Sequence, residues 1–366
     1  MKNTFGNSVS ITIFGESHGN MIGAVIDGMA PGISVDRTFI SHQLSLRRPQ
    51  GNISTSRHEQ DDFQIVSGVF NGTTTGTPIC ILIPNKDIHS SDYSEIRHFP
   101  RPGHADLTAH IKYRGFEDYR GGGHFSGRLT APLVAAGAIA IFALQKIGIT
   151  IGTHIKNCAG IQDHTFSDLK NELSLLNERS FPVICEEAGE RMKNAIEAAA
   201  LEKDSVGGIL ETAVLGLPAG VGEPWFDSLE SVLSHGLFSI PAVKGVEFGE
   251  GFGFAEMHGS EANDPIVCAN DGVNTATNHN GGVNGGISNG MPVIFRCAVK
   301  PTPSIAKPQQ TVNLATQEKA TLEIKGRHDP AILHRARVVV DSITALVLCD
   351  QLALRYGTDW LGGKDA

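Results

Sequence analysis

The sequence has no Cys-x-x-Cys pair, no long basic run and no apolar stretch long enough to cross a membrane. Its six cysteines are scattered along 366 residues, which excludes a zinc ribbon or thioredoxin-type motif and favours buried, reduced thiols. The net charge of −9 without a basic run argues against nucleic acid as the main partner. The longest apolar run, residues 131–144, falls short of the ~20 residues of a membrane span. We therefore expect a cytoplasmic protein that binds neither nucleic acid nor membrane.

Also missing are G-x-G-x-x-G and G-x-x-x-x-G-K-[ST], the glycine motifs that hold phosphates in Rossmann and P-loop folds. Glycine itself is abundant, with 42 residues, but it does not follow the Gly-X-Y period of collagen. Excess glycine in a globular chain is typical of turns and of loops that approach a ligand closely. The densest case is RGGGHFSGR, residues 120–128. Its three consecutive glycines predict that some group lies directly against the backbone.

Hydrophobic periodicity predicts both strands and helices. Asp36 is the expected N-cap of the first helix, and Ser126 that of the apolar helix after it. The stretch 248–290 is rich in Gly, Asn and Asp, which favours a binding-loop system over a linker. No segment has the composition of an interdomain linker, so we expect a single domain over residues 1–366. The expected strands are 8–15, 21–28, 63–70, 78–85 and 206–218, and the expected helices are 36–48, 129–148, 186–205 and 331–357.

The chain also contains a faint internal repeat. TGTPICILIPN (75–85) is similar to NGMPVIFRCAVKP (289–301), and each is followed by a histidine motif and then a long helix. This pattern indicates either an old duplication or chance.

Four short stretches place a histidine among glycines, and three of them add an arginine. Histidine suits proton transfer near neutral pH, and the arginine fork matches phosphate and carboxylate oxygens. Glycine lets backbone N–H groups approach an anion or a flat ring. Together they predict an anionic, phosphate-bearing ligand and acid–base chemistry. The stretches are GESHGN (15–20), RPGHAD (101–106), RGGGHFSGR (120–128) and GRHDP (326–330).

Two other interpretations of these motifs stay open from the residues alone. His104 with Asp106, and His328 with Asp329, could ligate the metal of a phosphohydrolase, although the neighbouring arginines repel a cation. Alternatively, the motifs could form a flavin- or anion-binding scaffold without turnover. A histidine beside glycine is also a common structural feature of turns, and the chain has 15 histidines.

Six stretches together resemble the signature motifs of the chorismate synthase family. They occur in that family's order and span residues 14–330: FGESHG with DGMAPG, RPGHAD, DYRGGG, GGVNGGISNGMP with KPTPSI, and KGRHDP. The resemblance implies an α+β fold, a β–α–β sandwich whose antiparallel sheets flank a helical core, assembled as a homotetramer. It implies a lyase of the shikimate pathway, which supplies aromatic amino acid biosynthesis. The reaction is the 1,4-elimination of phosphate from 5-enolpyruvylshikimate 3-phosphate to give chorismate.

The resemblance further implies a requirement for reduced FMN. NADPH bound to the protein, or an external flavin reductase, would supply the reduced flavin. Three residues would be catalytic: His18 would protonate the departing phosphate, His104 would support the protonation state of the flavin, and Asp329 would help remove the C6 proton.

The other implied site residues bind substrate or cofactor. The glycines 121–123 would let the backbone lie against FMN. The substrate set is Ser17, Arg47, Arg101, Arg128 and Arg327, with Arg47 also at the NADPH site. The flavin set is His124, Phe125, Ser126, Pro241, Ala242, Gly285, Lys300, Pro301, Thr302, Pro303, Ser304 and Arg327.

Overall fold

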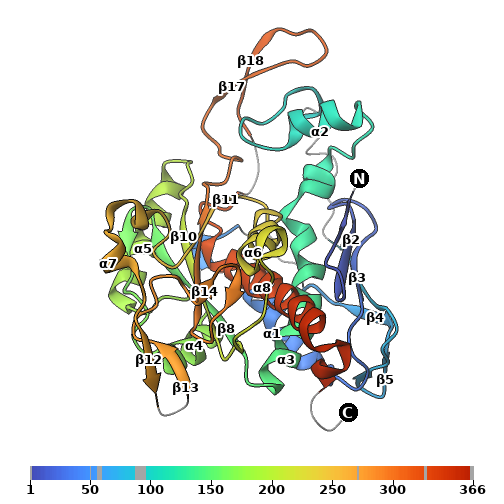
Figure 1. Ribbon diagram of the computed structural model, residues 1–366. Helices are drawn as coiled ribbons and strands as arrows, with labels where there is room; N and C mark the ends of the chain where they lie inside the picture. Colours follow the sequence, from blue (N-terminus) through green and yellow to red (C-terminus); the bar gives the residue numbers. More distant parts are fainter. Residues whose placement is uncertain are drawn as a thin grey trace.

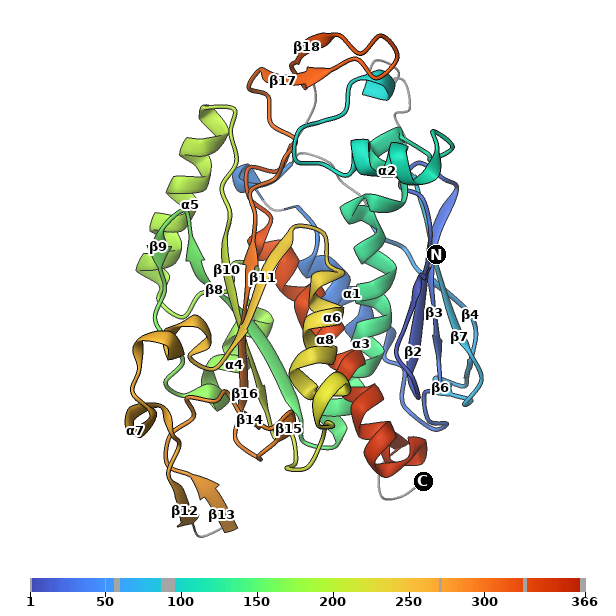
Figure 2. The same cartoon turned by 45° about the horizontal axis from the view of Figure 1, so that its top comes forward.

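Two five-stranded antiparallel sheets face each other across a layer of helices (Figures 1 and 2). The computed structural model describes residues 2–49, 51–55, 60–86, 96–269, 272–324 and 328–362. Sheet one has the strand order β1-β2-β3-β7-β4, and sheet two has the order β11-β16-β10-β8-β9. The helices α1, α3, α6 and α8 lie between the sheets (Figure 2). The predicted α+β class, with antiparallel sheets around a helical core, is confirmed.

Side chains of sheet one alternate between the helical layer and the outside. In β7, Ile79, Ile81 and Ile83 are fully buried, whereas the residues between them are partly exposed. This period of two is typical of an antiparallel sheet with one covered face. The strands are β1 (Thr4–Phe5), β2 (Ser10–Gly15), β3 (Met21–Asp27), β4 (Gln64–Ser67) and β7 (Ile79–Pro84).

Sheet two packs on the other side of the helices. Thr153 of β8 faces α8 and donates a 2.6 Å hydrogen bond to Asp341 Oδ1. Because neighbouring residues of a strand point to opposite faces, His154 lies on the outer face of this sheet. The strands are β8 (Thr150–Cys158), β9 (Ile161–Gln162), β10 (Gly208–Leu215), β11 (Val243–Phe248) and β16 (Val293–Val299).

The two longest helices cross closely in the core. A Cβ atom at Gly137 of α3 would lie 2.2 Å from the Cβ of Ser342 in α8, so this crossing requires glycine. Although its uninterrupted apolar run is shorter, the stretch Gly127–Lys146 could cross a membrane by length and composition. Its most apolar window is 83% buried inside the protein, as in a core helix. The helices are α1 (Arg37–Leu46), α2 (Asp106–Tyr113), α3 (Thr130–Lys146), α4 (Leu169–Glu178), α5 (Glu186–Leu201), α6 (Leu229–Phe238), α7 (Gly259–Ala262) and α8 (Leu333–Tyr356).

Short hairpins and 3₁₀ turns complete the chain. The hairpin β17–β18 and helix α2 extend beyond the same end of the two sheets (Figure 1). Backbone of that hairpin reaches the loop before α2, because Leu314 N donates to His98 O at 2.9 Å. The hairpins are β5 (Val69–Phe70) with β6 (Thr73–Thr74), β12 (Ile266–Ala269) with β13 (Gly272–Thr275), β14 (Val283–Asn284) with β15 (Ile287–Ser288), and β17 (Gln309–Val312) with β18 (Lys319–Leu322).

Asp36 caps α1 as predicted, because its side chain accepts from the N–H groups of Thr38 and Phe39. The prediction that Ser126 caps the apolar helix is wrong, because the N-cap residue of α3 is Leu129. The Ser126 hydroxyl accepts from Arg128 N and thereby caps the 3₁₀ turn η5 (Gly127–Leu129), which precedes α3.

The two segments of the internal repeat, 75–85 and 289–301, contain β7 and β16, each an interior strand of its sheet. Their common origin stays a prediction.

Candidate active site

Ser17 and His18 lie in the turn that joins β2 to β3, and both are buried. Ser17 Oγ is 3.0 Å from His18 Nδ1. The hydroxyl donates toward the carbonyl oxygens of Arg120 and Gly121, each 3.2 Å away. Because its single hydrogen is used there, the oxygen accepts from Nδ1–H of His18. The His18 ring is thereby held against the backbone of the glycine-rich turn.

The glycines 121–123 form the turn η4 (Arg120–Phe125) with φ values of +58°, +84° and +53°, a region that favours glycine. A Cβ on the first glycine would lie 2.3 Å from Cε1 of His18. On the second it would lie 3.1 Å from Cε1 of His104, and on the third 2.0 Å from the carbonyl oxygen of Asp118. The groups that exclude side chains here are therefore two histidine rings and a carbonyl of the protein itself. Contact of this turn with FMN stays a prediction.

Arg101, His104 and Asp106 form a compact group before and at the start of α2. The Asp106 carboxylate accepts from Arg101 Nε at 2.7 Å and from Arg101 NH2 at 2.8 Å. It also lies 2.6 Å from His104 Nδ1. Burial alone would raise the pKa of Asp106, but the hydrogen bonds from Arg101 and His104 outweigh it and hold this pKa well below its usual range. Asp106 is therefore an anion at any physiological pH.

The segment that follows β16 reaches the same loop. The Lys300 ammonium donates to Gly103 O, and Arg101 NH1 donates to Ser304 Oγ at 3.3 Å. The hydroxyl of Thr302 donates to the backbone oxygen of Asp329 at 2.6 Å. Lysine, threonine and serine side chains thus surround one edge of the histidine group. The prolines 301 and 303 fix the backbone between them.

Asp329 is half-buried, and both of its carboxylate oxygens accept hydrogen bonds. Oδ1 accepts from Thr55 N at 2.9 Å, and Oδ2 accepts from Arg335 NH1 at 2.5 Å. Arg335 also donates from Nε to the carbonyl oxygen of Arg47 at 2.8 Å. Through Arg335, Asp329 is connected to the arginine cluster at the end of α1.

That cluster holds two of the predicted substrate arginines around one buried carboxylate. Asp61 contacts Arg47 NH1 at 3.3 Å through Oδ2 and binds Arg128 NH1 through Oδ1. Arg47 Nε also donates to Thr130 Oγ1 at 2.8 Å. Two guanidinium groups thus share one carboxylate among the described residues. Guanidinium groups are suited to the anionic substrate of a protein whose net charge is −9.

The remaining flavin-loop residues lie along the start of the apolar helix. His124 Nδ1 donates to Gly15 O at 2.8 Å, which connects the loop to the end of β2. The Phe125 ring packs edge-to-face on Tyr113, with centroids 6.0 Å apart. Ser126 ends the turn. The loop is therefore anchored at several points before any ligand binds.

Not all predicted flavin residues meet in one chain. Ala242, which follows Pro241, accepts from Lys300 N at 3.0 Å, so this pair lies beside the site. Gly285 lies in the β14–β15 hairpin beyond the other end of β16. That strand has seven residues, which at 3.3 Å each separates its ends by roughly 20 Å. Arg327, predicted for both substrate and flavin, lies outside the described residues.

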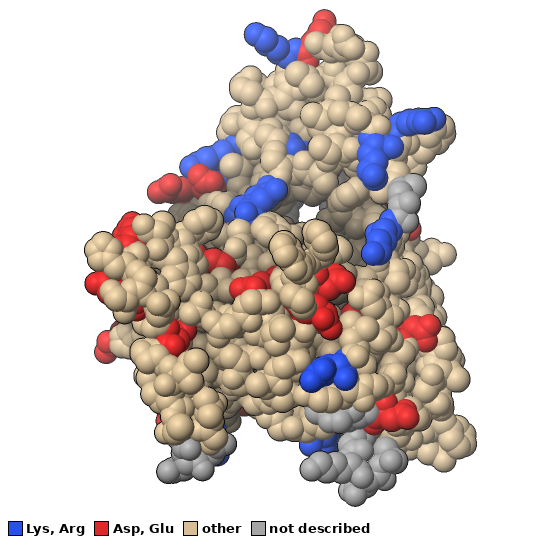
Figure 3. Space-filling view, in the orientation of Figure 1, with Lys and Arg blue, Asp and Glu red and all other residues tan. Residues whose placement is uncertain are grey.

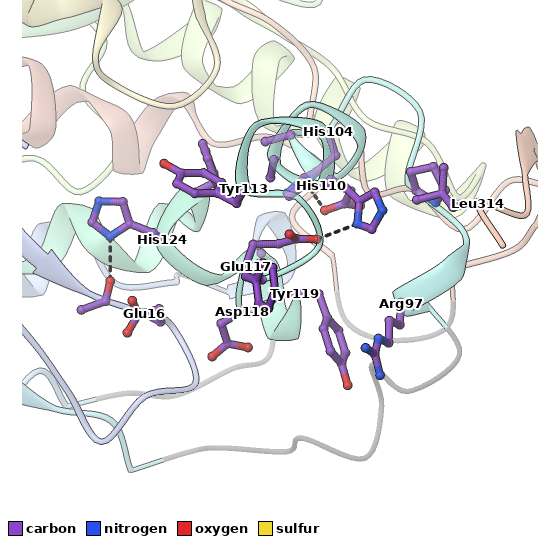
Figure 4. Close-up of a pocket in the computed structure, with 18 of the residues that line it drawn as sticks. Glu16, Arg97, His104, His110, Tyr113, Glu117, Asp118, Tyr119, His124 and Leu314 are labelled. Atoms are coloured by element: carbon purple, nitrogen blue, oxygen red, sulfur yellow. Dashed lines mark hydrogen bonds and ion pairs between the residues drawn. The ribbon is translucent and has the colours of Figure 1, made fainter. Parts of the chain in front are cut away.

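A cavity of about 370 Å³ opens beside His104 and Gly122. His124 and Phe125 line it, together with acidic and aromatic side chains from the segment after α2 (Figure 4). His18, Arg47, Arg128 and Asp329 are not among its lining residues. On the surface, Lys and Arg side chains surround a hollow between the α2 end and the two sheets (Figure 3). This cavity therefore takes in the histidine group and the flavin loop, and the arginine cluster lies outside its lining.

Sequence reasoning missed two groups of this site. Asp61 had no visible signal, because its arginine partners are distant in the sequence. His328 was considered only as a possible metal ligand. In the structure its Nε2 is buried without a hydrogen-bond partner among the described residues. Its burial lowers its pKa, and the nearby charge of Arg101 acts in the same direction. A neutral imidazole with an unpaired nitrogen is a ready contact for a heteroaromatic ligand.

The metal interpretation finds little support in the geometry. Asp106 already pairs with Arg101, and Asp329 with Arg335. Within the described ranges, no group of three His, Cys, Asp or Glu side chains could hold a metal ion.

Comparison with known proteins gives a consistent result. The family model described as chorismate synthase matches residues 9–353. The chain is 49% identical over 352 residues to the chorismate synthase of Pyrococcus abyssi, covering 96% of this chain and 97% of that one. It is 47% identical over 360 residues to that of Dehalococcoides mccartyi, covering 98% of each. A solved structure described as "Crystal Structure of Chorismate Synthase" superposes with a TM-score of 0.76 at 27% identity, covering 97% and 94%.

Proposed function

The chain belongs to the chorismate synthase family, and from this premise we propose which of its residues carry the reaction. It is a phosphate-eliminating lyase of the shikimate pathway. The substrate is 5-enolpyruvylshikimate 3-phosphate, the products are chorismate and phosphate, and the family implies reduced FMN. One observation supports the residue assignments most: the rings of His18 and His104 both lie against the glycine-rich turn, and Asp329 is joined to Arg47 through Arg335.

Arg47 and Arg128 bind the anionic groups of the substrate. A phosphate and two carboxylates need several cations, and planar guanidinium groups match their oxygens. Asp61 contacts both arginines and holds them in place. Arg327 completes the substrate set, and Ser17 contributes through its contact with His18.

His18 protonates the departing phosphate. Its Nδ1–H is directed to Ser17 Oγ, so the proton for the phosphate comes from Nε2 of the imidazolium form. Ser17 keeps the ring from rotating and fixes the direction of that transfer. His104 is the second acid–base group, and Asp329 takes part in removing the C6 proton.

The residues present fit a flavin phosphate and ring. The donor set comprises the Lys300 ammonium, the hydroxyls of Thr302 and Ser304, and the unpaired Nε2 of His328. Lysine and hydroxyl groups suit a phosphate, and a neutral imidazole suits a ring nitrogen or oxygen. Reduced FMN held there would supply transient electron density for an elimination that has no net redox change. The predicted set His124, Phe125, Ser126, Pro241, Ala242, Pro301 and Pro303 lines the rest of that site.

Assembly and flavin supply complete the proposal. Gly285 lies at the far end of sheet two, so its contact with a cofactor requires a second copy of the chain in the proposed homotetramer. NADPH bound near Arg47, or an external flavin reductase, keeps the flavin reduced. The single domain of residues 1–366 acts in the cytoplasm.

An anaerobic assay tests the reaction class. The purified protein is mixed with 5-enolpyruvylshikimate 3-phosphate and a chelator, with and without chemically reduced FMN, and chorismate and phosphate are followed together. We expect equal release of both products, only with reduced FMN. Phosphate without chorismate, or release that does not depend on flavin, would contradict the proposal and favour a phosphohydrolase.

A further inference from the structure

Asp106 binds a cation and an imidazole with the same carboxylate. Oδ2 accepts from Arg101 Nε at 2.7 Å and from the Arg101 backbone N–H at 3.0 Å. Oδ1 accepts from Arg101 NH2 at 2.8 Å and lies 2.6 Å from His104 Nδ1. All three side chains are largely buried, with 8–18% of their surfaces exposed. At this burial the pair is only weakly screened by water.

The contacts of Nδ1 indicate which nitrogen of His104 carries the proton. Arg101 NH2 is 3.1 Å from Nδ1, and a guanidinium can only donate. Nδ1 could therefore accept from Arg101 or carry a hydrogen that faces Asp106. Without a hydrogen, its lone pair would face a carboxylate oxygen at 2.6 Å, which is strongly repulsive. The charge of Asp106 therefore favours a hydrogen on Nδ1, which leaves the lone pair of the neutral ring on Nε2.

The Nε2 edge of the ring faces the glycine-rich turn. A Cβ on Gly122 would lie 3.1 Å from Cε1 and 3.4 Å from Nε2 of His104. His104 and Gly122 both line the cavity of Figure 4. Only glycine at this position lets the ring approach the turn so closely.

We propose that Asp106 is a positioning residue that holds His104 as the Nδ1–H tautomer and directs its Nε2 toward the cavity. This inference rests on the proposed function, because it takes His104 as an acid–base group of the reaction. Arg101 then belongs to the support of His104, since its side chain is bound to Asp106 and Ser304. The substrate anions are left to the other arginines of the predicted substrate set.

Nitrogen NMR of the ligand-free protein tests the tautomer independently of activity. The protein is labelled with ¹⁵N-histidine, and the spectrum of His104→Gln identifies the His104 signals. We expect the Nδ1–H pattern in the wild type and a shift toward Nε2–H in Asp106→Asn. The matched control is Asp118→Asn, which breaks a similar carboxylate–guanidinium pair with Arg120 and should leave the His104 signals unchanged. An Nε2–H pattern in the wild type would overturn the proposal even if Asp106→Asn did not fold.

Kinetics then separate this inference from the proposed function. Asp106→Asn should lower kcat about 10-fold or more, up to the full effect of losing His104. Asp106→Glu should restore part of the rate. In a His104→Ala background, Asp106→Asn should change kcat less than about 2-fold. An undiminished effect in that background would overturn the positioning role, whereas a wild type inactive with reduced FMN would overturn the proposed function and leave the tautomer result standing.

Discussion

The candidate site and the outer face of sheet two are both buried and charged, but they are assembled in opposite ways. On sheet two, four strands place one charged residue each in direct register: His154, Glu211, Arg296 and Glu247. Contacts run along this row, with His154 Nε2 2.9 Å from Glu211 Oε2 and Arg296 Nε 2.7 Å from Glu247 Oε1. In the site, the charged groups come from turns and helix ends far apart in the sequence.

The difference separates a structural network from a functional one. In the row, the signs alternate, and the opposite-sign neighbours on adjacent strands stabilise the sheet. In the site, three consecutive glycines adopt positive φ, and His328 Nε2 has no partner within the described ranges. Unpaired buried groups and tight glycine turns are costly unless a ligand uses them. Losses in the site should therefore reduce turnover, and losses in the row should reduce stability.

His104→Ala should have the largest effect on turnover. Loss of an acid–base group lowers the rate by about 10²–10⁴-fold, and the fold should survive because the ring lies at a cavity. The matched control is His110→Ala, since His110 lines the same cavity and pairs with Glu117 at 3.0 Å. Steady-state kinetics with reduced FMN measure both. If turnover fell equally in the two variants, or only a few-fold in His104→Ala, the role of His104 would be structural and not catalytic.

Asp329→Ala should follow, with a loss of turnover of about 10²-fold and retained FMN binding. Its carboxylate contacts Thr55 and Arg335 rather than the Lys300–Ser304 segment, so cofactor affinity should change little. Fluorescence titration with FMN and kinetics at saturating FMN measure the two effects separately. Loss of FMN binding with near-normal turnover at saturation would contradict the role of Asp329 as a base.

The sequence predicted regular elements well where one periodic pattern determines them. The expected strand 78–85 is β7, and the expected helix 331–357 is α8, each within two residues at either end. Both are apolar segments that are buried in the core, so local pattern and tertiary packing agree. Several motifs also meet in space, because the glycine-rich turn contacts the rings of His18 and His104, and the Lys300–Ser304 segment contacts Gly103 and Asp329. Gly285 is the exception, at the far end of sheet two.

Long-range partners could not be predicted in the same way. Asp61 joins Arg47 and Arg128, which are 14 and 67 residues away, and no spacing rule connects them. The residues that contact the three glycines could not be predicted either. The turns that carry His18 and His104 come together only when the chain has folded. The glycines did predict a close approach, but not that side chains of the protein itself make it.

His154→Gln tests the structural side of the comparison. His154 also donates toward Asp163, 2.8 Å away. Its loss leaves the buried Asp163 without its cation, and Glu211 with only the more distant Lys156 and Arg296. Breaking such a buried network costs about 3–5 kcal/mol in the free energy of unfolding. Urea denaturation measures it, and turnover per folded molecule should stay unchanged.

The same variant carries a pH signature. Burial alone would lower the pKa of His154, but its hydrogen bonds to Asp163 and Glu211 outweigh it and raise this pKa above 6.5. The charged ring therefore stabilises the fold fully below that value, and the contribution is lost as the pH rises through the folded-state pKa. Denaturation at several pH values should show the difference between wild type and His154→Gln shrinking at alkaline pH. A difference that grows with pH would contradict a charged His154.

Glu247→Gln should have the smallest effect, although it removes a charge from the same row. Glu247 lies at the end of the row, and its side chain is 25% exposed, so water screens the pair. Arg296 keeps two other partners, Gly249 O at 2.6 Å and Glu211 Oε1 at 3.6 Å. The free energy of unfolding should therefore fall by about 1 kcal/mol or less, and less still at high salt. If Glu247→Gln lowered the free energy of unfolding as much as His154→Gln, the stabilisation from each pair in the row would depend on its place in the strand register and not on its burial.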